Sequence, residues 1–510
     1  MIPTPPSSIE IMDTTLRDGE QTSGVSFSVS EKLTLAKLLL EELCVDRIEI
    51  ASARVSEGEF EAVKSITSWA KTQGRLQQIE ILTFVDKGIS LDWMQKAGAK
   101  VQNLLTKGSL NHLTHQLKQS PEEHFEHVGR CIDEAAERGI ITNVYLEDWS
   151  NGMRNAQDYV LRYLDFLSTK AIKRILLPDT LGVLTPEETQ RFIALIRERY
   201  PQMHFDFHGH NDYDLGVANA VQAVKAGVNG LHLTVNGMGE RAGNAPLASV
   251  VAVINDFIPE TKTNIKEKAL FKVSQLVATF TGFRIPANKP IVGANVFTQT
   301  AGIHADGDSK KNLYFNDLLP ERFGRKRSYA LGKTSGKANI VKNLQELGLT
   351  LNEDELKQVT QRIIELGDKK QKVTADDLPF IISDVLNTKK SPPSVVIKSY
   401  VLTHAKGLQP STTVCIEING ELLEENACGD GQYDAFLNAV RKIYKRKKIA
   451  LPQLVDYAVH IPPGSHSDAL CETSITWRNS TREFITRGLD SDQTVSAIQA
   501  TEKMLNTLTY

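Results

Sequence analysis

Short runs of β-branched and other apolar residues alternate with longer stretches of helical periodicity from the start of the chain to about residue 260. This alternation is typical of βα units around a parallel sheet. Eight strands are expected, each followed by an amphipathic helix, at residues 9–13, 47–50, 78–83, 100–105, 142–147, 174–178, 204–208 and 230–234. Eight units in roughly 250 residues predict a closed (β/α)8 TIM barrel over 1–260. An open, doubly wound sheet is the alternative, but no glycine-rich phosphate fingerprint follows the first strand.

The alternation stops after residue 260, where prolines and glycines interrupt a region of helices and loops. A helical linker subdomain is therefore expected over 261–390. The run KKSPP at 389–393 suits neither a helix nor a central strand and predicts a domain boundary. Beyond it, a compact α+β domain is expected over 391–510, as two rough copies of strands followed by a helix: strands 394–402 and 413–418, the turn Asn419–Gly420 and helix 433–444, then strands 456–461, 473–477 and 483–487 and helix 491–505.

The composition favours a globular protein that acts on small molecules. Hydrophobic residues make up 41% and charged residues 24%, and the net charge of −3 offers no field to recruit nucleic acid or an anionic membrane. No apolar run of about 18 residues and no signal-like amino terminus occur, so a cytoplasmic location is expected. The five cysteines are scattered without a CxxC pair, which indicates neither a disulfide framework nor a zinc-thiolate site.

Polar residues gather where the first predicted strand ends, and in a TIM barrel the reacting groups lie at these carboxyl ends. Arg17 and Asp18 stand side by side there. An arginine can fork onto a carboxylate or polarise a carbonyl, and an aspartate can bind a hard cation. An ordinary surface salt bridge is the competing interpretation for such a pair taken alone.

Two histidines end the seventh strand, and a glycine-rich loop follows the eighth. His208 and His210 project to the same side because strand side chains alternate. Barrel closure brings Asp18 near them, and Asn244 in the loop can add a neutral oxygen. Satisfied core histidines and a loop without ligands are the alternatives. The mixed nitrogen and oxygen set predicts a divalent metal and does not choose among Mg, Mn, Zn and Co.

Three motifs resemble those of the DRE-TIM metallolyase superfamily and, within it, the 2-isopropylmalate, homocitrate and citramalate synthases: LRDGEQ after strand one, HGHND after strand seven and NGMGERAGNA after strand eight. The connector's GIHADG and the C-terminal domain also resemble this family. The resemblance implies Asp18, His208 and His210 as metal ligands, Asn244 as a weaker ligand, and Arg17 as the group on the developing oxyanion.

The resemblance also bears on the connector and on the last domain. It implies that His304 and Asp306 enter the neighbouring subunit's active site, hence a homodimer, and that 391–510 is a regulatory domain that binds leucine or isoleucine. The acetyl-CoA site it implies comprises Asp306, Asn312, Leu313 and Tyr314. The run GDGQYDA replaces the family's commoner GxGPVDA, so the identity of the effector cannot be transferred from the family to this chain.

The implied reaction is a metal-dependent Claisen condensation of acetyl-CoA with a 2-oxo acid. Arg17, Glu147 and His304 are the expected catalytic residues, with Glu147, alone or paired with His304, as base for the thioester methyl group. Leu82, Leu105, Tyr145 and Thr180 are expected to bind the oxo acid.

The choice of oxo acid rests on the size of Tyr145. The residue at this position is usually smaller in 2-isopropylmalate synthases. The segments NLY (312–314), RFGRKR (322–327) and YLE (145–147) resemble citramalate synthase, which predicts pyruvate rather than 2-oxoisovalerate. A lyase running the reverse cleavage and an inactive barrel that binds an amino acid are the competing interpretations.

Overall fold

The computed structural model describes residues 4–308, 313–346, 349–368, 373, 378–386, 395–460, 471–480 and 483–507. The chain forms two compact units, one of Met1–Thr298 with Phe315–Ser328 and one of Gln299–Tyr314 with Tyr329–Tyr510. The predicted division into three domains at 260 and 390 stays a prediction, and the KKSPP boundary lies outside the described residues.

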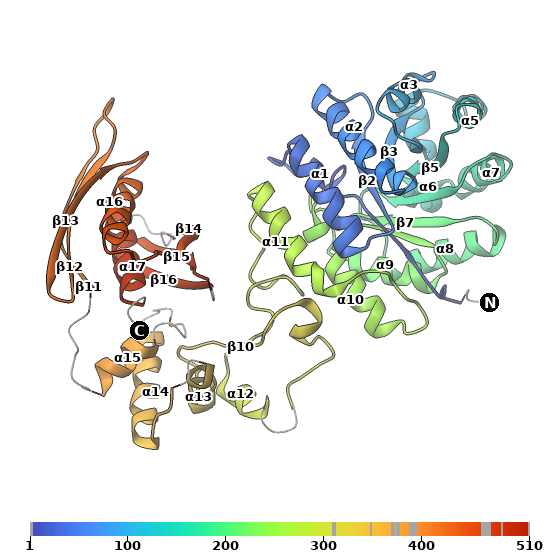
Figure 1. Cartoon of the computed structure of the whole chain (residues 1–510). Coiled ribbons are helices and arrows are strands. Elements are labelled where there is room, and N and C mark those ends of the chain that lie inside the picture. Colours follow the sequence, from blue (N-terminus) through green and yellow to red (C-terminus); the bar gives the residue numbers. More distant parts are fainter. Residues whose placement is uncertain are drawn as a thin grey trace. The chain divides into compact units, whose positions relative to one another are not determined.

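Eight parallel strands close into a barrel in the first unit, which confirms the predicted TIM barrel (Figure 1). Closure comes from pairing of the first strand with the last, where Glu10 lies opposite Gly230. Each strand overlaps its predicted position. The strands are β1 (Glu10–Asp13), β2 (Arg47–Ser52), β3 (Ile79–Phe84), β4 (Val101–Lys107), β5 (Ile141–Glu147), β6 (Arg174–Asp179), β7 (Phe205–Gly209) and β8 (Gly230–Leu233).

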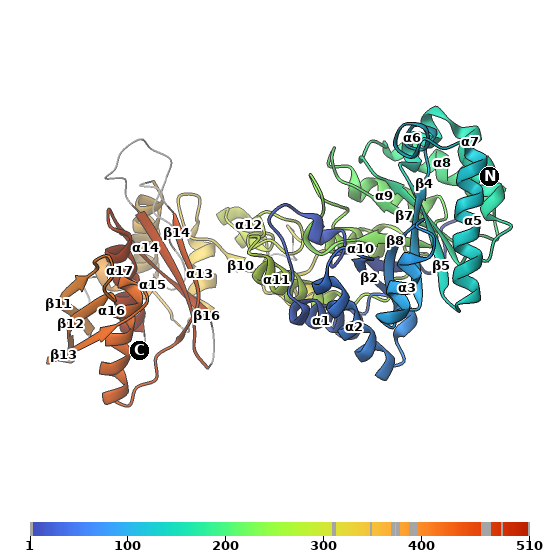
Figure 2. The same ribbon diagram turned by 90° about the horizontal axis from the view of Figure 1, so that it is seen from above.

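Helices surround the strands on the outside of this unit (Figure 2). Several begin at a strong N-cap. The Ser120 and Thr185 side chains accept hydrogen bonds from the backbone N–H groups of Glu123 and Glu188, and the carboxylates of these glutamates accept from the backbone N–H groups of Ser120 and Thr185. The helical segments are η1 (Gly19–Gln21), α1 (Val29–Lys37), η2 (Leu38–Leu43), α2 (Glu57–Thr72), η3 (Leu76–Gln78), α3 (Ile89–Lys96), α4 (Leu110–His112), η4 (Leu113–Leu117), α5 (Pro121–Glu137), α6 (Trp149–Asn155), α7 (Gln157–Leu167), α8 (Pro186–Arg199), α9 (Gly216–Lys225), η5 (Val235–Gly237), α10 (Leu247–Phe257), η6 (Glu267–Ala269), α11 (Leu270–Thr281) and η7 (Pro320–Phe323).

The barrel interior contains a buried ionic cluster. The Arg47 guanidinium lies 2.9 Å from the Glu80 carboxylate and 2.5 Å from that of Asp206. Burial would lower the pKa of Arg47, but these carboxylates outweigh it and raise that pKa. Because an unpaired buried charge is strongly destabilising, the three side chains depend on one another.

The second unit contains short helices and two three-stranded antiparallel sheets, with α16 (Gln432–Arg446) and α17 (Gln493–Thr507) lying between the sheets (Figure 1). The sheets comprise β11 (Val395–Thr403), β12 (Ser411–Ile418) and β13 (Glu421–Cys428), and β14 (Gln453–His460), β15 (Cys471–Arg478) and β16 (Glu483–Asp490). The other helices are α12 (Gly302–Asp308), α13 (Lys337–Glu346), α14 (Glu353–Asp368) and α15 (Leu378–Val385), and β9 (Thr298–Gln299) pairs with β10 (Ser328–Tyr329).

The repeat of strands and a helix is as expected, except that the sequence pattern missed β13. Its residues, ELLEENAC, favour a helix by intrinsic preference. The turn at Asn419 and Gly420, both with positive φ, reverses the chain and pairs β13 with β12 along its whole length. Among the described residues, no helix combines the length and apolar character that a membrane span requires.

Candidate active site

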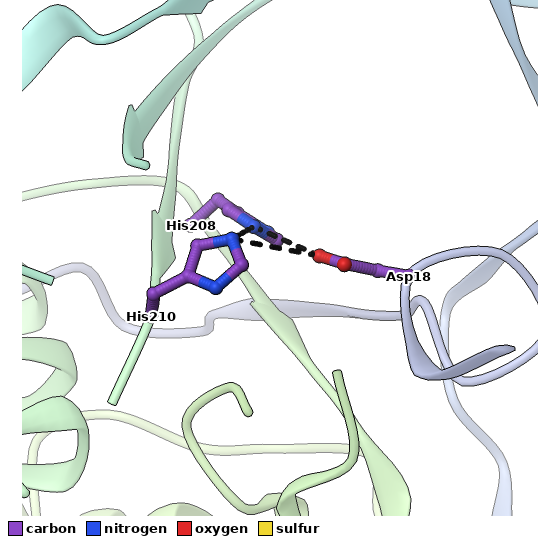
Figure 3. A group of neighbouring side chains, drawn as sticks. All are labelled: Asp18, His208 and His210. Atoms are coloured by element: carbon purple, nitrogen blue, oxygen red, sulfur yellow. Dashed lines mark hydrogen bonds and ion pairs between the residues drawn. The ribbon is translucent and has the colours of Figure 1, made fainter. Parts of the chain in front are cut away.

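Asp18, His208 and His210 meet at the mouth of the barrel (Figure 3). Asp18 follows β1, His208 lies near the end of β7, and His210 comes just after that strand. The His208 Nε2 atom lies 3.1 Å from Asp18 Oδ2 and 3.3 Å from His210 Nε2, and His210 Nε2 lies 3.9 Å from Asp18 Oδ2. All three side chains are buried, and one potential ligand atom from each lies within 4.8 Å of the other two.

These atoms have the character of metal ligands. Within the described part of the chain, neither carboxylate oxygen of Asp18 has a hydrogen-bond partner, which is rare for a buried acceptor. Burial would raise the pKa of Asp18, but the positive charge of Arg17 and the nearby His208 hold that pKa well below its usual range. Burial and His208 lower the pKa of His210 to about 4, so its imidazole is neutral at pH 7. One carboxylate and two imidazoles fit a divalent cation that keeps open positions.

Asn244 lies in the loop after β8, bridged to His210 through the backbone. Its Nδ2 donates to the Met238 carbonyl at 3.0 Å, and its buried Oδ1 has no partner among the described residues. The loop needs glycine at Gly243, where φ is 83° and a Cβ would lie 2.0 Å from the Gly237 oxygen. The tight loop thus fixes an amide with a free acceptor next to His210.

Arg17 is held by a carboxylate that the sequence analysis missed. Its Nε donates to Glu49 on β2 at 2.6 Å, and its Nη1 lies 3.7 Å from Asp18. Glu49 is fully buried and also accepts from Asn103 at 2.7 Å. Burial acts to lower the pKa of Arg17, but Glu49 and Asp18 raise it, so the guanidinium stays charged. A glutamate between Ile48 and Ile50 within a predicted strand was the available signal.

A cavity of about 220 Å³ opens beside the Asp18 cluster. All four residues expected to bind the oxo acid line it, together with Arg17, Glu147 and the three clustered side chains; Asn244 does not. Three further lining residues were not expected from the sequence, and two of them lie inside the quoted motifs. The complete lining is Arg17, Asp18, Gln21, Leu82, Leu105, Tyr145, Glu147, Pro178, Thr180, His208, His210 and Glu240.

Tyr145 closes one side of this cavity and is itself 3% exposed. Its ring packs with Leu82 and Leu176, and its hydroxyl lies 2.9 Å from Nδ1 of His232. Burial lowers the pKa of His232 to about 3, so the ring is neutral, and its Nε2 lies 3.1 Å from the Asp206 carboxylate. Burial would raise the pKa of Asp206, but Arg47 and its other partners outweigh burial and hold that pKa well below its usual range. Nε2 therefore carries the proton, Nδ1 accepts, and Tyr145 donates. This chain of bonds fixes the ring.

Glu147 stands at the junction of two cavities. A second cavity of about 690 Å³ shares Leu105 and Glu147 with the first and is also lined by the cations Lys87, Lys107 and Arg130. Lys107 is the residue opposite Glu147 in the pairing of β4 with β5, and its ammonium bonds the Glu147 carboxylate. A long anionic ligand in the larger cavity would thus present its end beside Glu147.

The connector residues lie in the second unit. His304 and Asp306 belong to α12, and the His304 ring centroid is 4.3 Å from that of Tyr314. Ile303, His304, Leu313 and Tyr314 are exposed, and Asn312 lies outside the described residues.

Residues 8–277 match the family model described as HMGL-like. The chain belongs to the HMGL-like family. Residues 291–371 match a homocitrate synthase post-HMGL domain, and 372–509 match a LeuA allosteric (dimerisation) domain. Family members use a divalent metal, and the buried Asp18 cluster fits one.

Two full-length relatives come from Methanocaldococcus jannaschii. The (R)-citramalate synthase is 33% identical over 503 residues, covering 98% of this chain and 99% of that protein. The 2-isopropylmalate synthase is 33% identical over 505 residues, covering 97% of this chain and 93% of that protein. Because both identities are equal, similarity alone does not choose between the two oxo acids.

Proposed function

We propose that this chain condenses acetyl-CoA with a small 2-oxo acid in a metal-dependent reaction, and that pyruvate is the preferred oxo acid, giving citramalate. The observation that carries the proposal is the 220 Å³ cavity, which puts the Asp18 cluster, Arg17 and Glu147 around one small space narrowed by Tyr145. The relatives' names support the same reaction class. The alternative is 2-isopropylmalate synthase with 2-oxoisovalerate.

Each chemical task has a residue on this cavity. Asp18, His208 and His210, with Asn244 as a weaker ligand, would hold the metal, which supplies Lewis-acid polarisation of the ketone. Arg17 stabilises the negative charge that develops on the ketone oxygen. The Thr180 hydroxyl accepts a hydrogen bond from the Asp148 N–H at 2.9 Å and can itself donate to the substrate carboxylate. Glu147, alone or paired with His304, removes the methyl proton.

The larger cavity suits the coenzyme. Its volume of about 690 Å³ and its cationic residues Lys87, Lys107 and Arg130 fit a long ligand with phosphate groups. The connector residues Asp306, Asn312, Leu313 and Tyr314 are proposed to complete this site in a homodimer. The exposure of Leu313 and Tyr314 supports a role for them against another surface.

Mixing the enzyme with acetyl-CoA, a divalent cation and a panel of 2-oxo acids is expected to release CoA thiol fastest with pyruvate. The measurement is thiol release, with identification of the product acid. A lyase would instead cleave citramalate and release no thiol from acetyl-CoA. An amino-acid-binding protein without activity would do neither, and either result contradicts the proposal.

Regulation through the C-terminal domain is the second part of the proposal. A cavity of about 550 Å³ there is lined by residues at the starts of α16 and α17, among them Gln432, Tyr433 and Asp434. These three residues belong to the run that departs from the family's commoner motif, and they are the proposed contacts for leucine or isoleucine.

A cytoplasmic location also stays a prediction.

Truncation near residue 390 is expected to abolish inhibition by the end-product amino acid, because the proposed effector cavity lies wholly beyond that point. The measurement is a dose-response curve for leucine and for isoleucine on full-length and truncated protein. A truncated protein that remains active and equally inhibited would place the effector site elsewhere.

A further inference from the structure

Lys107 is a buried cation of the proposed coenzyme cavity that none of the chemical steps described so far uses. It ends β4 and lies directly opposite Glu147, which ends β5. The pair continues the register of Leu105 with Tyr145, two residues earlier on the same strands. Because side chains alternate along a strand, Lys107 and Glu147 project to the same side as the two residues that line the oxo acid cavity.

The ammonium of Lys107 has unused hydrogen-bonding capacity. It carries three donor hydrogens, and among the described residues its only side-chain partner is Glu147. One oxygen of Glu147 accepts that bond, and the other has no hydrogen-bond partner among the described residues. The pair therefore offers a free carboxylate oxygen and free N–H donors side by side.

We propose that Lys107 is a catalytic residue that stabilises the thioester enolate, a role that rests on the proposed condensation. Glu147 takes a proton from the methyl carbon of acetyl-CoA as the C–H bond breaks. The electron pair left on carbon forms the C=C bond of the enolate, and the carbonyl π pair moves onto the thioester oxygen. Lys107 donates a hydrogen bond to that oxygen.

The place of Lys107 at the larger cavity supports this role. The thioester would arrive from that cavity, which Lys107 and Glu147 both line, and Glu147 also lines the oxo acid cavity. Arg17 is engaged by Glu49 and Asp18 and belongs to the lining of the smaller cavity. The base then acts on the methyl carbon and the oxyanion partner on the carbonyl oxygen of one acyl group. Donors placed where charge develops contribute strongly to catalysis when the site is buried.

Lys107→Met tests the proposal in the full-length protein with saturating pyruvate and divalent cation. We expect kcat to fall by about 100- to 1,000-fold, as for loss of an oxyanion donor, with little change in KM for acetyl-CoA. The primary isotope effect on kcat with methyl-deuterated acetyl-CoA should increase, because proton removal becomes slower than the later steps. Lys118→Met, at an exposed lysine that directly follows η4, is the control for loss of one positive charge and should behave as the wild type.

Two further variants separate catalysis from positioning. Lys107→Gln keeps a donor for Glu147 but removes the charge, and it should remain slow. Lys107→Ala should be rescued in a saturable manner by added ethylamine, whose ammonium can replace the lost one. Wild-type kcat in the glutamine variant, or a raised KM with unchanged kcat in the methionine variant, would overturn the proposal. If the wild type releases no thiol with any oxo acid, the condensation itself fails instead.

Discussion

Replacing Asp18 by asparagine is expected to lower kcat/KM for condensation by about a thousandfold or more. A Lewis-acid metal supplies several kcal/mol of transition-state stabilisation, and each ~1.4 kcal/mol changes the rate about tenfold. The fold should survive, because the Asp18 carboxylate accepts no hydrogen bond from the surrounding described residues. Steady-state kinetics with pyruvate and a thermal unfolding curve measure both effects.

Metal binding can also be measured without an activity assay, from the thermal stability of the protein. The melting temperature of the wild type should rise when a divalent cation is added to chelator-treated protein, since a ligand that binds only the folded state stabilises it. Asp18→Asn should lose most of that rise. Asp212→Asn is the matched control, because this nearby carboxylate pairs with Arg241 and lies outside the Asp18 cluster. Full activity in metal-free wild type, or in Asp18→Asn, would remove the metal assignment.

Tyr145→Ser is expected to shift the ratio of kcat/KM from pyruvate towards 2-oxoisovalerate by at least about tenfold. One methylene in an apolar pocket discriminates by roughly 1–3 kcal/mol, or about 10- to 200-fold. Removing the ring opens space beside Leu82 and Leu105, which line the same cavity. Competition between the two oxo acids, with the products separated by mass, measures the ratio directly.

Tyr145→Phe separates the ring from its hydroxyl. This variant keeps the bulk and should keep the pyruvate preference, while its free energy of unfolding falls by about 1–3 kcal/mol because Nδ1 of His232 loses its donor. A wild-type enzyme that already prefers 2-oxoisovalerate would make the 2-isopropylmalate synthase interpretation the correct one.

The sequence predicted the barrel well, because short parallel strands with helices between them leave a regular hydrophobic pattern. It also indicated Asp18, His208 and His210, since in the closed barrel only β8 separates the carboxyl ends of β1 and β7. The partners that hold these groups were harder to find. Glu49 lies between two isoleucines within β2 and Lys107 ends β4, and only the folded structure shows which group each one faces.

The C-terminal domain shows the opposite limit. Its β13 has residues that prefer a helix, and antiparallel pairing with β12 overrides that preference. A local pattern could not reveal a pairing decided by the neighbouring strand. The connector posed a further difficulty, because the predicted role of His304 and Asp306 depends on a second subunit rather than on their own surroundings.

The chain of bonds behind Tyr145 has an evolutionary consequence. Tyr145 donates to His232, which donates to Asp206, which in turn pairs with Arg47. A substitution of Tyr145 that widens the oxo acid cavity therefore also leaves a buried acceptor, Nδ1 of His232, without its donor, next to the ionic cluster of Asp206 and Arg47. Residues in one such network give non-additive effects, so a single change at 145 shifts the specificity at a cost in stability, and a correlated change at 232 would restore that stability. Laboratory evolution towards larger oxo acids should accordingly recover paired replacements at these two positions.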